Sequence, residues 1–481
     1  MDWLPDELLL QFFDGSSIAE LCALSRVSSR WRSIARSHPT FWRSVSIREW
    51  EVSRGALPTF LERVRQCPEA PLDIEFDFDL DVPKAVLDAV RANLQRATSI
   101  RMSSREENWP LSTFDVPAPR LRRLEMSACQ RSHHSPAAAA PATTTIFAGQ
   151  APQLRSVKFA DLIFWLDLSA VVKFPAVVDV DVSFSSAFSS DLPADMFDRL
   201  ARLFPHMQSL VVNVFDYAKG QPARRFYASP LSDAASETFA GLKQLELWNS
   251  PACAATLSKL PVEAIPSIAL FNNIFNEPEV IRVLLPFAGD VCLSYDRCDA
   301  RSGSRKLVMS VLDGDRRLQR TLEASDGESL YSANMMRASM STRLVALSID
   351  KAAAWYSLIT AVDILPALRV LRLAFSGDQV WSTIKSVASP VSYERSIRCP
   401  SLRTWVLHTD GEVVVWPSAL VEKLFTAVVF LRRCADLQLH NVVLLDYGEG
   451  SEALESAATF GFKDLVVTVD PNSESWFDGL I

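Results

Sequence analysis

A short apolar pattern recurs along the chain after residue 50 and constrains the fold more than any other feature of the sequence. An apolar residue, two variable residues, a second apolar residue, one variable residue and a third apolar residue follow one another, often just after a proline. The clearest copies cover residues 119–126, 152–159, 205–212, 366–373 and 400–407. Such alternation is typical of a β-strand that buries one face. The chain is therefore expected to form the same kind of strand many times.

The spacing of the copies indicates a repeat architecture. The last apolar residue of each copy is its marker residue, and the markers, weaker copies included, are Phe76, Met102, Met126, Phe159, Val182, Val212, Leu247, Leu270, Leu293, Ile349, Leu373, Leu407, Leu439 and Val467. If the interval between Leu293 and Ile349 hides one further unit, the mean step is about 28 residues, within the roughly 20 to 29 residues of leucine-rich repeats. The array resembles a degenerate form of these repeats.

This resemblance implies a fold for residues 51–481. An irregular leucine-rich-repeat solenoid has parallel strands on its inner face and helices or loops outside, so the fold class is α/β. Candidate outer helices lie at residues 83–96, 195–204 and 419–433. Low-complexity residues 129–150 and polar residues 315–341 are expected to be mobile insertions.

Residues 1–50 have a different, helical pattern. Pro5 suits the first position of a helix, and the acidic residues after it suit the helix dipole. A Ser-x-x-Glu capping box at residues 17–20 opens a second helix. Ser28 or Ser29 could cap a third helix, which Pro39 would end. These signals predict three short helices.

A helical segment of this size has more apolar surface than it can bury by itself. The surplus includes Leu4, Leu9, Phe12, Leu24 and Trp31. Two interpretations stay open. Another protein covers this surface, or the segment docks on the rest of its own chain and caps the open end of a solenoid.

Residues 3–47 resemble an F-box in the order and spacing of their motif. The matching positions are Leu4, Pro5, Glu7, Leu8 and Leu9 of the opening, then Phe12, Phe13, Leu21, Val27, Trp31 and Arg32, and finally Phe41, Trp42 and Arg43. The sequence departs from the family pattern at Ser16, where a leucine is usual, and at Ser28, where a cysteine commonly follows the valine.

The F-box resemblance implies partners and a binding surface. F-boxes bind a Skp-family adaptor, which connects them to a cullin in a ubiquitin ligase, while the repeats hold a protein substrate. The layout also resembles F-box proteins of basidiomycete fungi. The adaptor-binding residues carried over from the resemblance are Leu4, Pro5, Leu8, Leu9, Phe12, Leu21, Leu24, Val27, Trp31 and Trp42.

Alternation also predicts which side chains the inner face of the sheet displays, namely those next to each marker. Bulky and ionisable side chains are common at binding hot spots, so the candidate substrate-binding residues are Trp248, Phe271, His408 and His440. The charged residues predicted for the same face are Glu75, Arg101, Glu125, Lys158, Asp181 and Glu246. The alternative is a solvated sheet face with a loop folded over it.

Composition and apolar runs limit which binding partners and which cellular compartment are expected for the chain. The net charge of −8 disfavours binding to nucleic acid or to an anionic membrane surface. The 8 cysteines are scattered, as expected of reduced thiols rather than of a disulfide framework. The N-terminus lacks the features of a signal peptide, and apolar runs are shorter than the roughly 18 residues of a membrane span. A cytoplasmic or nuclear protein is expected.

Signals for catalysis are weak. The sequence lacks the G-x-S-x-G, H-E-x-x-H and P-loop motifs. Residues 448–453 imitate a dinucleotide-binding turn, but too little chain follows them to complete such a domain. The histidine and cysteine groupings lack the paired spacing of a zinc site. We therefore expect no catalytic residue, cofactor or metal.

The leading hypothesis is a non-catalytic substrate receptor of a Skp-cullin-F-box type ubiquitin ligase. In this hypothesis the helices recruit the adaptor and the repeats recruit a protein target. The alternative is a leucine-rich-repeat interaction scaffold that is not linked to a ubiquitin ligase, in which the N-terminal helices only cap the repeats.

Overall fold

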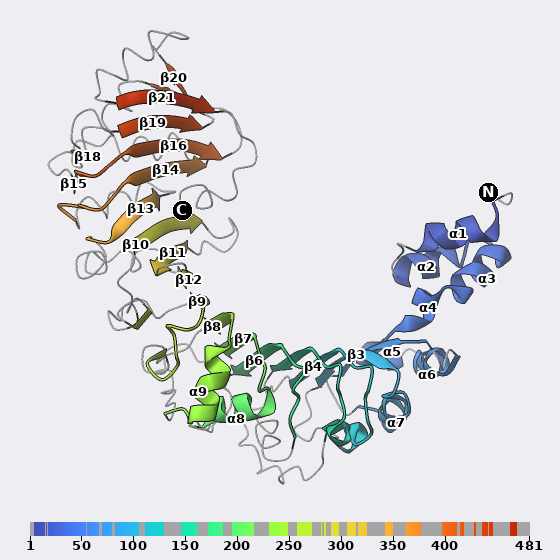
Figure 1. The fold of residues 1–481 in the computed structure, drawn as a ribbon. Coiled ribbons are helices and arrows are strands. Elements are labelled where there is room, and N and C mark those ends of the chain that lie inside the picture. Colours follow the sequence, from blue (N-terminus) through green and yellow to red (C-terminus); the bar gives the residue numbers. More distant parts are fainter. Residues whose placement is uncertain are drawn as a thin grey trace. The chain divides into compact units, whose positions relative to one another are not determined.

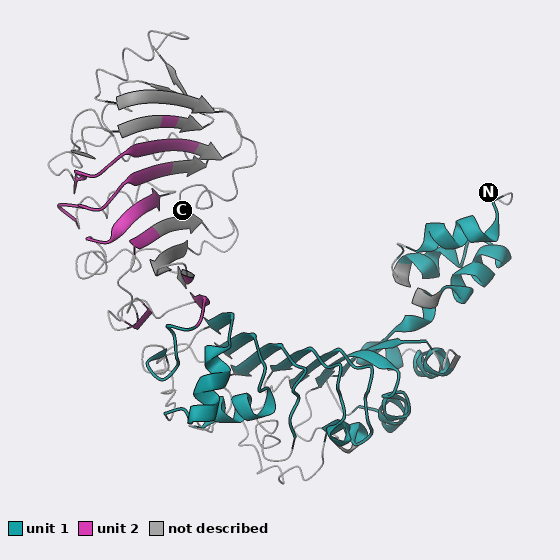
Figure 2. Ribbon diagram, in the orientation of Figure 1, with its two compact units in different colours: residues 1–264 teal, residues 265–481 magenta. Residues whose placement is uncertain are grey.

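The computed structural model of the chain contains two compact units, residues 1–264 and residues 265–481, and each is described by itself (Figure 2). The predicted domain boundary at residue 50 lies inside the first unit. The structure describes residues 4–14, 16, 18–53, 55–66, 70–78, 82–104, 111–128, 146–160, 172–185, 195–215, 230–248, 257–271, 280, 283–284, 290–297, 305–313, 316–324, 342–349, 362–376, 397–410, 414–417, 428–429, 435–440, 442–445 and 462–468.

The first unit begins with helices and continues as a sheet with further helices on one side (Figure 1). Its helices are α1 (Asp6–Phe13), α2 (Ile18–Leu24), α3 (Ser29–Ser37), α4 (Pro39–Arg43), α5 (Glu49–Val52), α6 (Leu57–Gln66), α7 (Lys84–Ala92), α8 (Met196–Leu203) and α9 (Asp233–Ala240), with short 3-10 turns η1 (Leu111–Phe114) and η2 (Ile146–Gly149). Its strands are β1 (Ser44–Arg48), β2 (Leu72–Phe78), β3 (Ala97–Ser104), β4 (Arg123–Ala128), β5 (Ser156–Ala160), β6 (Asp179–Ser185), β7 (Ser209–Phe215) and β8 (Gln244–Trp248).

Helices α1 to α4 confirm the predicted helical N-terminus. Pro5 occupies the cap position before α1, and acidic residues follow in the first turn. Ser28, rather than Ser29, caps α3, because its hydroxyl oxygen accepts a hydrogen bond from the Trp31 N–H at 3.1 Å. Helix α3 ends before Pro39, which then begins the additional helix α4. A proline is tolerated there because the first turn of a helix needs no intrahelical N–H donor.

The helical segment packs around one apolar core. The core consists of Leu9, Phe13, Leu21, Trp31, Ile34 and Ala35. The rings of Phe13 and Trp31 lie 5.6 Å apart between centroids and join α1 to α3. Burial of a large apolar side chain stabilises a fold by roughly 1.5–3 kcal/mol. Ser17, the predicted cap of α2, lies outside the described residues.

Strands β1 to β8 form a parallel sheet in which each strand pairs with the next one along the chain. The register aligns the predicted markers in an unbroken row, Phe76, Met102, Met126, Phe159, Val182, Val212 and Leu247. Parallel neighbours need a crossover segment between them, so each marker step supplies one strand and one return segment. The expected parallel sheet is confirmed.

The markers lie on the buried face of this sheet. In β2, Ile74 and Phe76 are buried, whereas Glu75 between them is partly exposed. Helices α7, α8 and α9 lie on one side of the strands (Figure 1). Helices α7 and α8 coincide with the predicted outer helices at residues 83–96 and 195–204. Phe197 of α8 and Phe239 of α9 meet edge to face at 5.5 Å, so aromatic packing joins neighbouring return segments.

The second unit has a sheet with a different strand order. Its strands are β9 (Ser267–Phe271), β10 (Asp290–Arg297), β11 (Arg305–Asp313), β12 (Arg316–Ala324), β13 (Leu344–Ile349), β14 (Val370–Ser376), β15 (Ile397–Arg398), β16 (Thr404–Asp410), β17 (Val414–Pro417), β18 (Val428–Val429), β19 (Ala435–His440), β20 (Val442–Leu445) and β21 (Phe462–Thr468). The paired order is β9, β12, β11, β10, β13, β14, β16, β19 and β21. Strand β11 is antiparallel to both of its neighbours, and the other pairs are parallel.

The interval between Leu293 and Ile349 contains a β-hairpin instead of a further repeat. The hairpin strands β11 and β12 lie between β10 and β9 in the sheet. Leu293 pairs with Leu347, two residues before the next marker, Ile349. Parallel and antiparallel strands share the same period of two, so the sequence pattern did not reveal the strand direction. From Ile349 to Val467 the predicted markers pair in register again.

Three further expectations change, two of them in the second unit and one in the first. Residues 316–324 of the predicted insertion at 315–341 form β12, and residues 325–341 lie outside the described residues. Of the other insertion, residues 146–149 form η2 and residues 129–145 lie outside the described part. In the candidate outer helix at 419–433, residues 428–429 are strand β18, and the remaining residues are not described.

A buried arginine connects the hairpin to the start of β9. Arg320 of β12 is 0% exposed, and its Nη1 donates hydrogen bonds to the carbonyl oxygens of Ile265 and Pro266 at 3.0 and 3.1 Å. Burial lowers the pKa of this guanidinium to about 10. The backbone carbonyls replace the water that the buried cation has lost, so the hairpin is held by a polar contact that apolar patterning does not predict.

The buried Cys399 makes the stability of the second unit depend on pH. Burial raises the pKa of this thiol from 9.0 to about 12. An unfolded chain releases the thiol proton near pH 9, whereas the native chain keeps it. The stabilising contribution is therefore present below about pH 9 and is lost as the pH rises toward 12.

We expect the difference in free energy of unfolding between the wild type and Cys399→Ala to shrink by roughly 2 kcal/mol between about pH 8 and about pH 10.5. Urea denaturation under reducing conditions measures this difference, and other titrating groups cancel because both proteins share them. An equal difference at both pH values would contradict the prediction.

Candidate functional site

Large apolar side chains are exposed on the helical segment. Leu8 and Phe12, one turn apart on α1, are 48% and 64% exposed, and Val27, just before α3, is 63% exposed. We call these three residues the exposed apolar set. Exposed apolar surface of this kind often marks a site at which another protein binds.

The structure separates the predicted adaptor-binding residues by burial. Leu9, Leu21 and Trp31 are buried in the helical core, Leu4, Leu24 and Trp42 are half-buried, and Pro5, Leu8, Phe12 and Val27 are exposed. The ring of buried Trp31 lies edge to face with the ring of exposed Phe12, with 6.5 Å between the centroids. The buried residues therefore support the surface from below rather than forming it.

Polar contacts hold α1 against α3 and so fix the exposed apolar set. The guanidinium of Arg30 donates from Nε and Nη2 to Asp6 Oδ1 at 2.9 and 2.7 Å. It also donates to the carbonyl oxygen of Leu4. At the other ends of the two helices, Nε2 of His38 lies 3.0 Å from Asp14 Oδ1. Sequence motifs identified these helices but not these contacts.

The helical segment is joined to the sheet through its last residues. Strand β1 follows α4 directly and pairs in parallel with β2. Arg43, the last residue of α4, donates from Nε to Asp73 Oδ2 on β2 at 3.0 Å. The helices and the sheet are thus connected by backbone pairing and by an ion pair.

Arg63 of α6 reinforces this junction. Its Nη2 donates to the carbonyl oxygens of Phe41 and Ser44 at 2.5 and 2.8 Å, and its guanidinium lies 5.4 Å from the centroid of the Phe41 ring. Burial lowers the pKa of Arg63, and the nearby Cys22 partly offsets this effect. A single cation therefore holds both the last turn of α4 and the start of β1.

Charged side chains cross the exposed face of the first sheet in one row. The register aligns Glu75, Arg101, Glu125, Lys158, Asp181, Val211 and Glu246 on β2 to β8. Nε of Arg101 binds Glu125 Oε2 at 2.8 Å, and Lys158 Nζ binds Asp181 Oδ2 at 3.0 Å. The hydrogen bond to Glu125 and the charge of that carboxylate raise the pKa of Arg101.

A depression of about 230 Å³ lies on this face over β4 to β7. The side chains that shape it include Arg123, Ser156, Lys158, Asp179, Asp181 and Ser209. Short serine side chains alternate with longer charged ones along this part of the sheet, so the serines form the floor of the depression.

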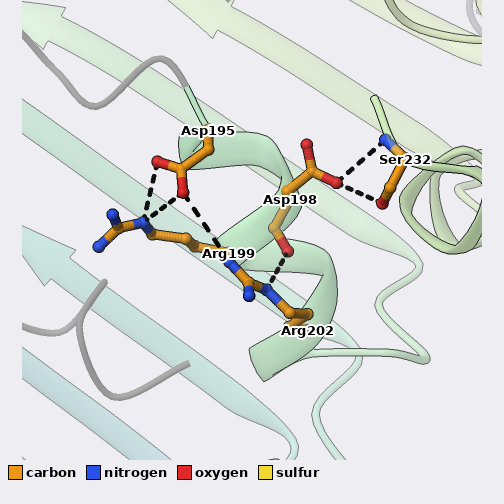
Figure 3. Close-up of polar contacts among 5 residues, drawn as sticks. All are labelled: Asp195, Asp198, Arg199, Arg202 and Ser232. Atoms are coloured by element: carbon orange, nitrogen blue, oxygen red, sulfur yellow. Dashed lines mark hydrogen bonds and ion pairs between the residues drawn. The ribbon is translucent and has the colours of Figure 1, made fainter. Parts of the chain in front are cut away.

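Helices α8 and α9, which lead into β7 and β8, are tied to each other by Asp198 (Figure 3). Asp198 Oδ1 accepts a hydrogen bond from the Ser232 N–H at 3.1 Å and another from the Ser232 hydroxyl. The same hydroxyl oxygen accepts the Ala235 N–H at 3.3 Å and so caps α9. Asp195 accepts from Arg199 Nε at 2.9 and 3.0 Å. These contacts order the return segments that precede β7 and β8.

The predicted substrate-binding residues are divided between the two compact units. Trp248 is half-buried at the end of β8, and its Nε1 donates to Glu246 Oε2 at 3.3 Å. Phe271 is half-buried at the end of β9, in the second unit. His408 is 6% exposed, so the expectation that it lies on an open face is wrong. His440 pairs with His408 in the register, and its side chain lies outside the described ones.

Burial on both faces explains the result for His408. Every residue of β13 is buried, irrespective of the side to which it points. A second apolar cluster consists of Cys292, Val345, Ala346, Val370 and Val406. Alternation predicts an open face only where one face of a strand is solvated, and this condition fails around β13, β14 and β16.

Comparison with protein families bears on the helical segment and β1. Residues 1–48 match the family model described as F-box-like. This part of the chain is an F-box-like domain. F-box domains in general bind Skp-family adaptors and belong to non-catalytic receptor subunits of ubiquitin ligases. A comparison with curated proteins finds no match.

Membrane-spanning helices and metal-binding clusters are absent from the described part of the chain. None of its helices combines the length and the hydropathy that crossing a membrane requires. Its histidine, cysteine, aspartate and glutamate side chains form no group of three or more that could hold a metal ion.

We expect Arg63→Ala to lower the free energy of unfolding by roughly 1–3 kcal/mol, because the Phe41 and Ser44 carbonyls then lose a half-buried charged donor. Arg65→Ala is the matched control, since Arg65 is an exposed arginine of the same helix. Urea denaturation measures the change in stability, and limited proteolysis should show faster cleavage between the F-box-like domain and β2 in Arg63→Ala. Equal behaviour of the two variants would show that Arg63 does not stabilise the junction.

Proposed function

We propose that the chain is the substrate receptor of a Skp-cullin-F-box type ubiquitin ligase. The F-box-like domain binds a Skp-family adaptor and, through it, a cullin. The repeats recruit a protein target for ubiquitination and degradation, in the cytoplasm or the nucleus. The chain itself performs no catalysis, because it acts by holding the target close to the ubiquitin-carrying enzyme.

The exposed apolar set of the F-box-like domain is the observation that carries this proposal. Leu8, Phe12 and Val27 stay in contact with water in the isolated chain, and covering each of them would contribute roughly 1.5–3 kcal/mol. In this proposal they touch the adaptor together with Pro5. The half-buried Leu4, Leu24 and Trp42 border the contact, and the buried Leu9, Leu21 and Trp31 maintain its shape.

The regular sheet supports the second half of the proposal. One parallel strand per marker step, with the markers in register, is the arrangement expected of degenerate leucine-rich repeats in a solenoid. The solvated face of β2 to β8 offers charged side chains to a protein target, and Trp248 and Phe271 remain candidate contacts. The fixed junction at β1 supports a receptor in which adaptor and target are held at a defined separation.

The test is co-expression with a Skp-family adaptor followed by size-exclusion chromatography. We expect the wild type to co-elute with the adaptor and the triple variant Leu8→Ala, Phe12→Ala, Val27→Ala to bind it at least roughly a thousandfold more weakly. Trp50→Ala is the control, because Trp50 is 52% exposed and follows the F-box-like match. Trp31→Ala is unsuitable, since removing a buried tryptophan costs about 3–5 kcal/mol of folding stability.

A wild-type chain that is folded by circular dichroism but does not co-elute would overturn the receptor function. The interaction scaffold, in which the helices only cap the sheet, would then be the better interpretation. Equal adaptor binding by the triple variant and the wild type would instead move the adaptor contact away from the exposed apolar set.

A further inference from the structure

We propose that the depression over β4 to β7 binds an extended segment of a partner protein that carries one acidic and one basic side chain two residues apart. This inference rests on the proposed function insofar as that partner is the substrate. Three observations support it. Two opposite charges in the depression lack an ion-pair partner among the described residues, their spacing fits an extended chain, and short serine side chains form the floor of the depression.

Two opposite charges in the depression have no ion-pair partner among the described residues. Glu125 is paired with Arg101, and Lys158 with Asp181. Arg123 and Asp179 make no such contact within the described part of the chain, and both are exposed to solvent. An unpaired cation and an unpaired anion on one face can each accept a complementary group without breaking an existing pair.

The spacing of Arg123 and Asp179 fits an extended peptide. The register places Arg123 opposite Ser156 and Ser156 opposite Asp179, so the two charges are separated by two strand spacings, roughly 9–10 Å. An extended chain repeats its side chains on one side about every 6.6–6.8 Å. The flexible side chains of arginine, lysine, glutamate and aspartate cover the remaining distance. A peptide that crosses the strands can thus place a carboxylate at Arg123 and a cation at Asp179.

The floor of the depression suits a peptide backbone. Ser156 and Ser209 flank Asp179 on the neighbouring strands. Each hydroxyl can donate one hydrogen bond and accept others, which matches the alternating N–H and C=O groups of an extended chain. Their short side chains leave the backbone room to approach between the charged groups.

The charge balance favours a protein over a nucleic acid. Arg123 and Lys158 contribute two positive charges to the lining, whereas Glu125, Asp179 and Asp181 contribute three negative ones. A polyanion would be repelled, because the lining of the depression carries a net negative charge. A segment with both signs of charge satisfies both unpaired groups, and such complementarity provides specificity more than affinity.

Selection from a phage-displayed library of random peptides on the immobilised full chain tests the proposal. The wild type should enrich peptides with one acidic and one basic residue two positions apart. Arg123→Glu makes both free charges negative, so it should enrich peptides with two basic residues at that spacing. Asp179→Lys should enrich two acidic residues. These expectations hold for either direction of the bound peptide.

The matched controls are Lys84→Glu and Asp88→Lys, which reverse one charge of each sign at exposed positions of α7. They should enrich the same peptides as the wild type. A synthetic peptide from the wild-type selection should lose about two- to fivefold in affinity for each attraction that is removed, and more where it becomes repulsion. Its binding should also weaken between about 50 and about 500 mM salt.

Enrichment that is the same for the wild type, Arg123→Glu and Asp179→Lys would overturn the proposal, and so would enrichment without the charge spacing. Adaptor co-elution of the same preparations keeps this outcome separate from the proposed function. A chain that selects the expected peptides but binds no adaptor retains the peptide site and loses the receptor function. A chain that binds the adaptor but selects no charge pattern retains the receptor function and loses this site.

Discussion

Backbone hydrogen bonds between β1 and β2 join the F-box-like domain to the sheet, and the arrangement of the first unit follows from them. Strand β1 belongs to the F-box-like match, yet its buried Val45 and Ile47 extend the buried face of the sheet. A cut after residue 50 would remove this strand and expose the edge of β2, where unpaired N–H and C=O groups favour association with other chains. The F-box-like domain and the sheet are therefore physically continuous.

The parallel register gives the two faces of the first sheet different roles. Because successive side chains alternate, each step buries a marker such as Phe159 and exposes a neighbour such as Lys158. The buried row stabilises the array, and the exposed row assembles charges from strands that are far apart in the sequence. In the second unit both faces of β13 are buried, so the same alternation produces core rather than a displayed surface.

The F-box-like domain shows how much of a binding site can be predicted from motif positions alone. Order and spacing identified the helices and the family resemblance, because start and stop signals and apolar residues lie within each short helical stretch of the sequence. The same motif did not distinguish Leu8, which is exposed, from Leu9, which is buried. Both are leucines on a helix whose apolar arc is wider than one neighbour needs, and only the packing of α3 decides which of them it covers.

The sequence by itself determined the helical N-terminus, its family resemblance, and a parallel sheet with one strand per repeat, because capping signals and apolar periodicity act over a few residues. Only the tertiary structure decided the direction of β11 and β12, the burial of His408 and the contacts of Arg63 and Arg320. It also decided that Arg123 and Asp179 lie two strands apart with no ion-pair partner among the described residues. These features depend on which segments, far apart in the sequence, pack against one another. A pattern over a few neighbouring residues does not contain that information.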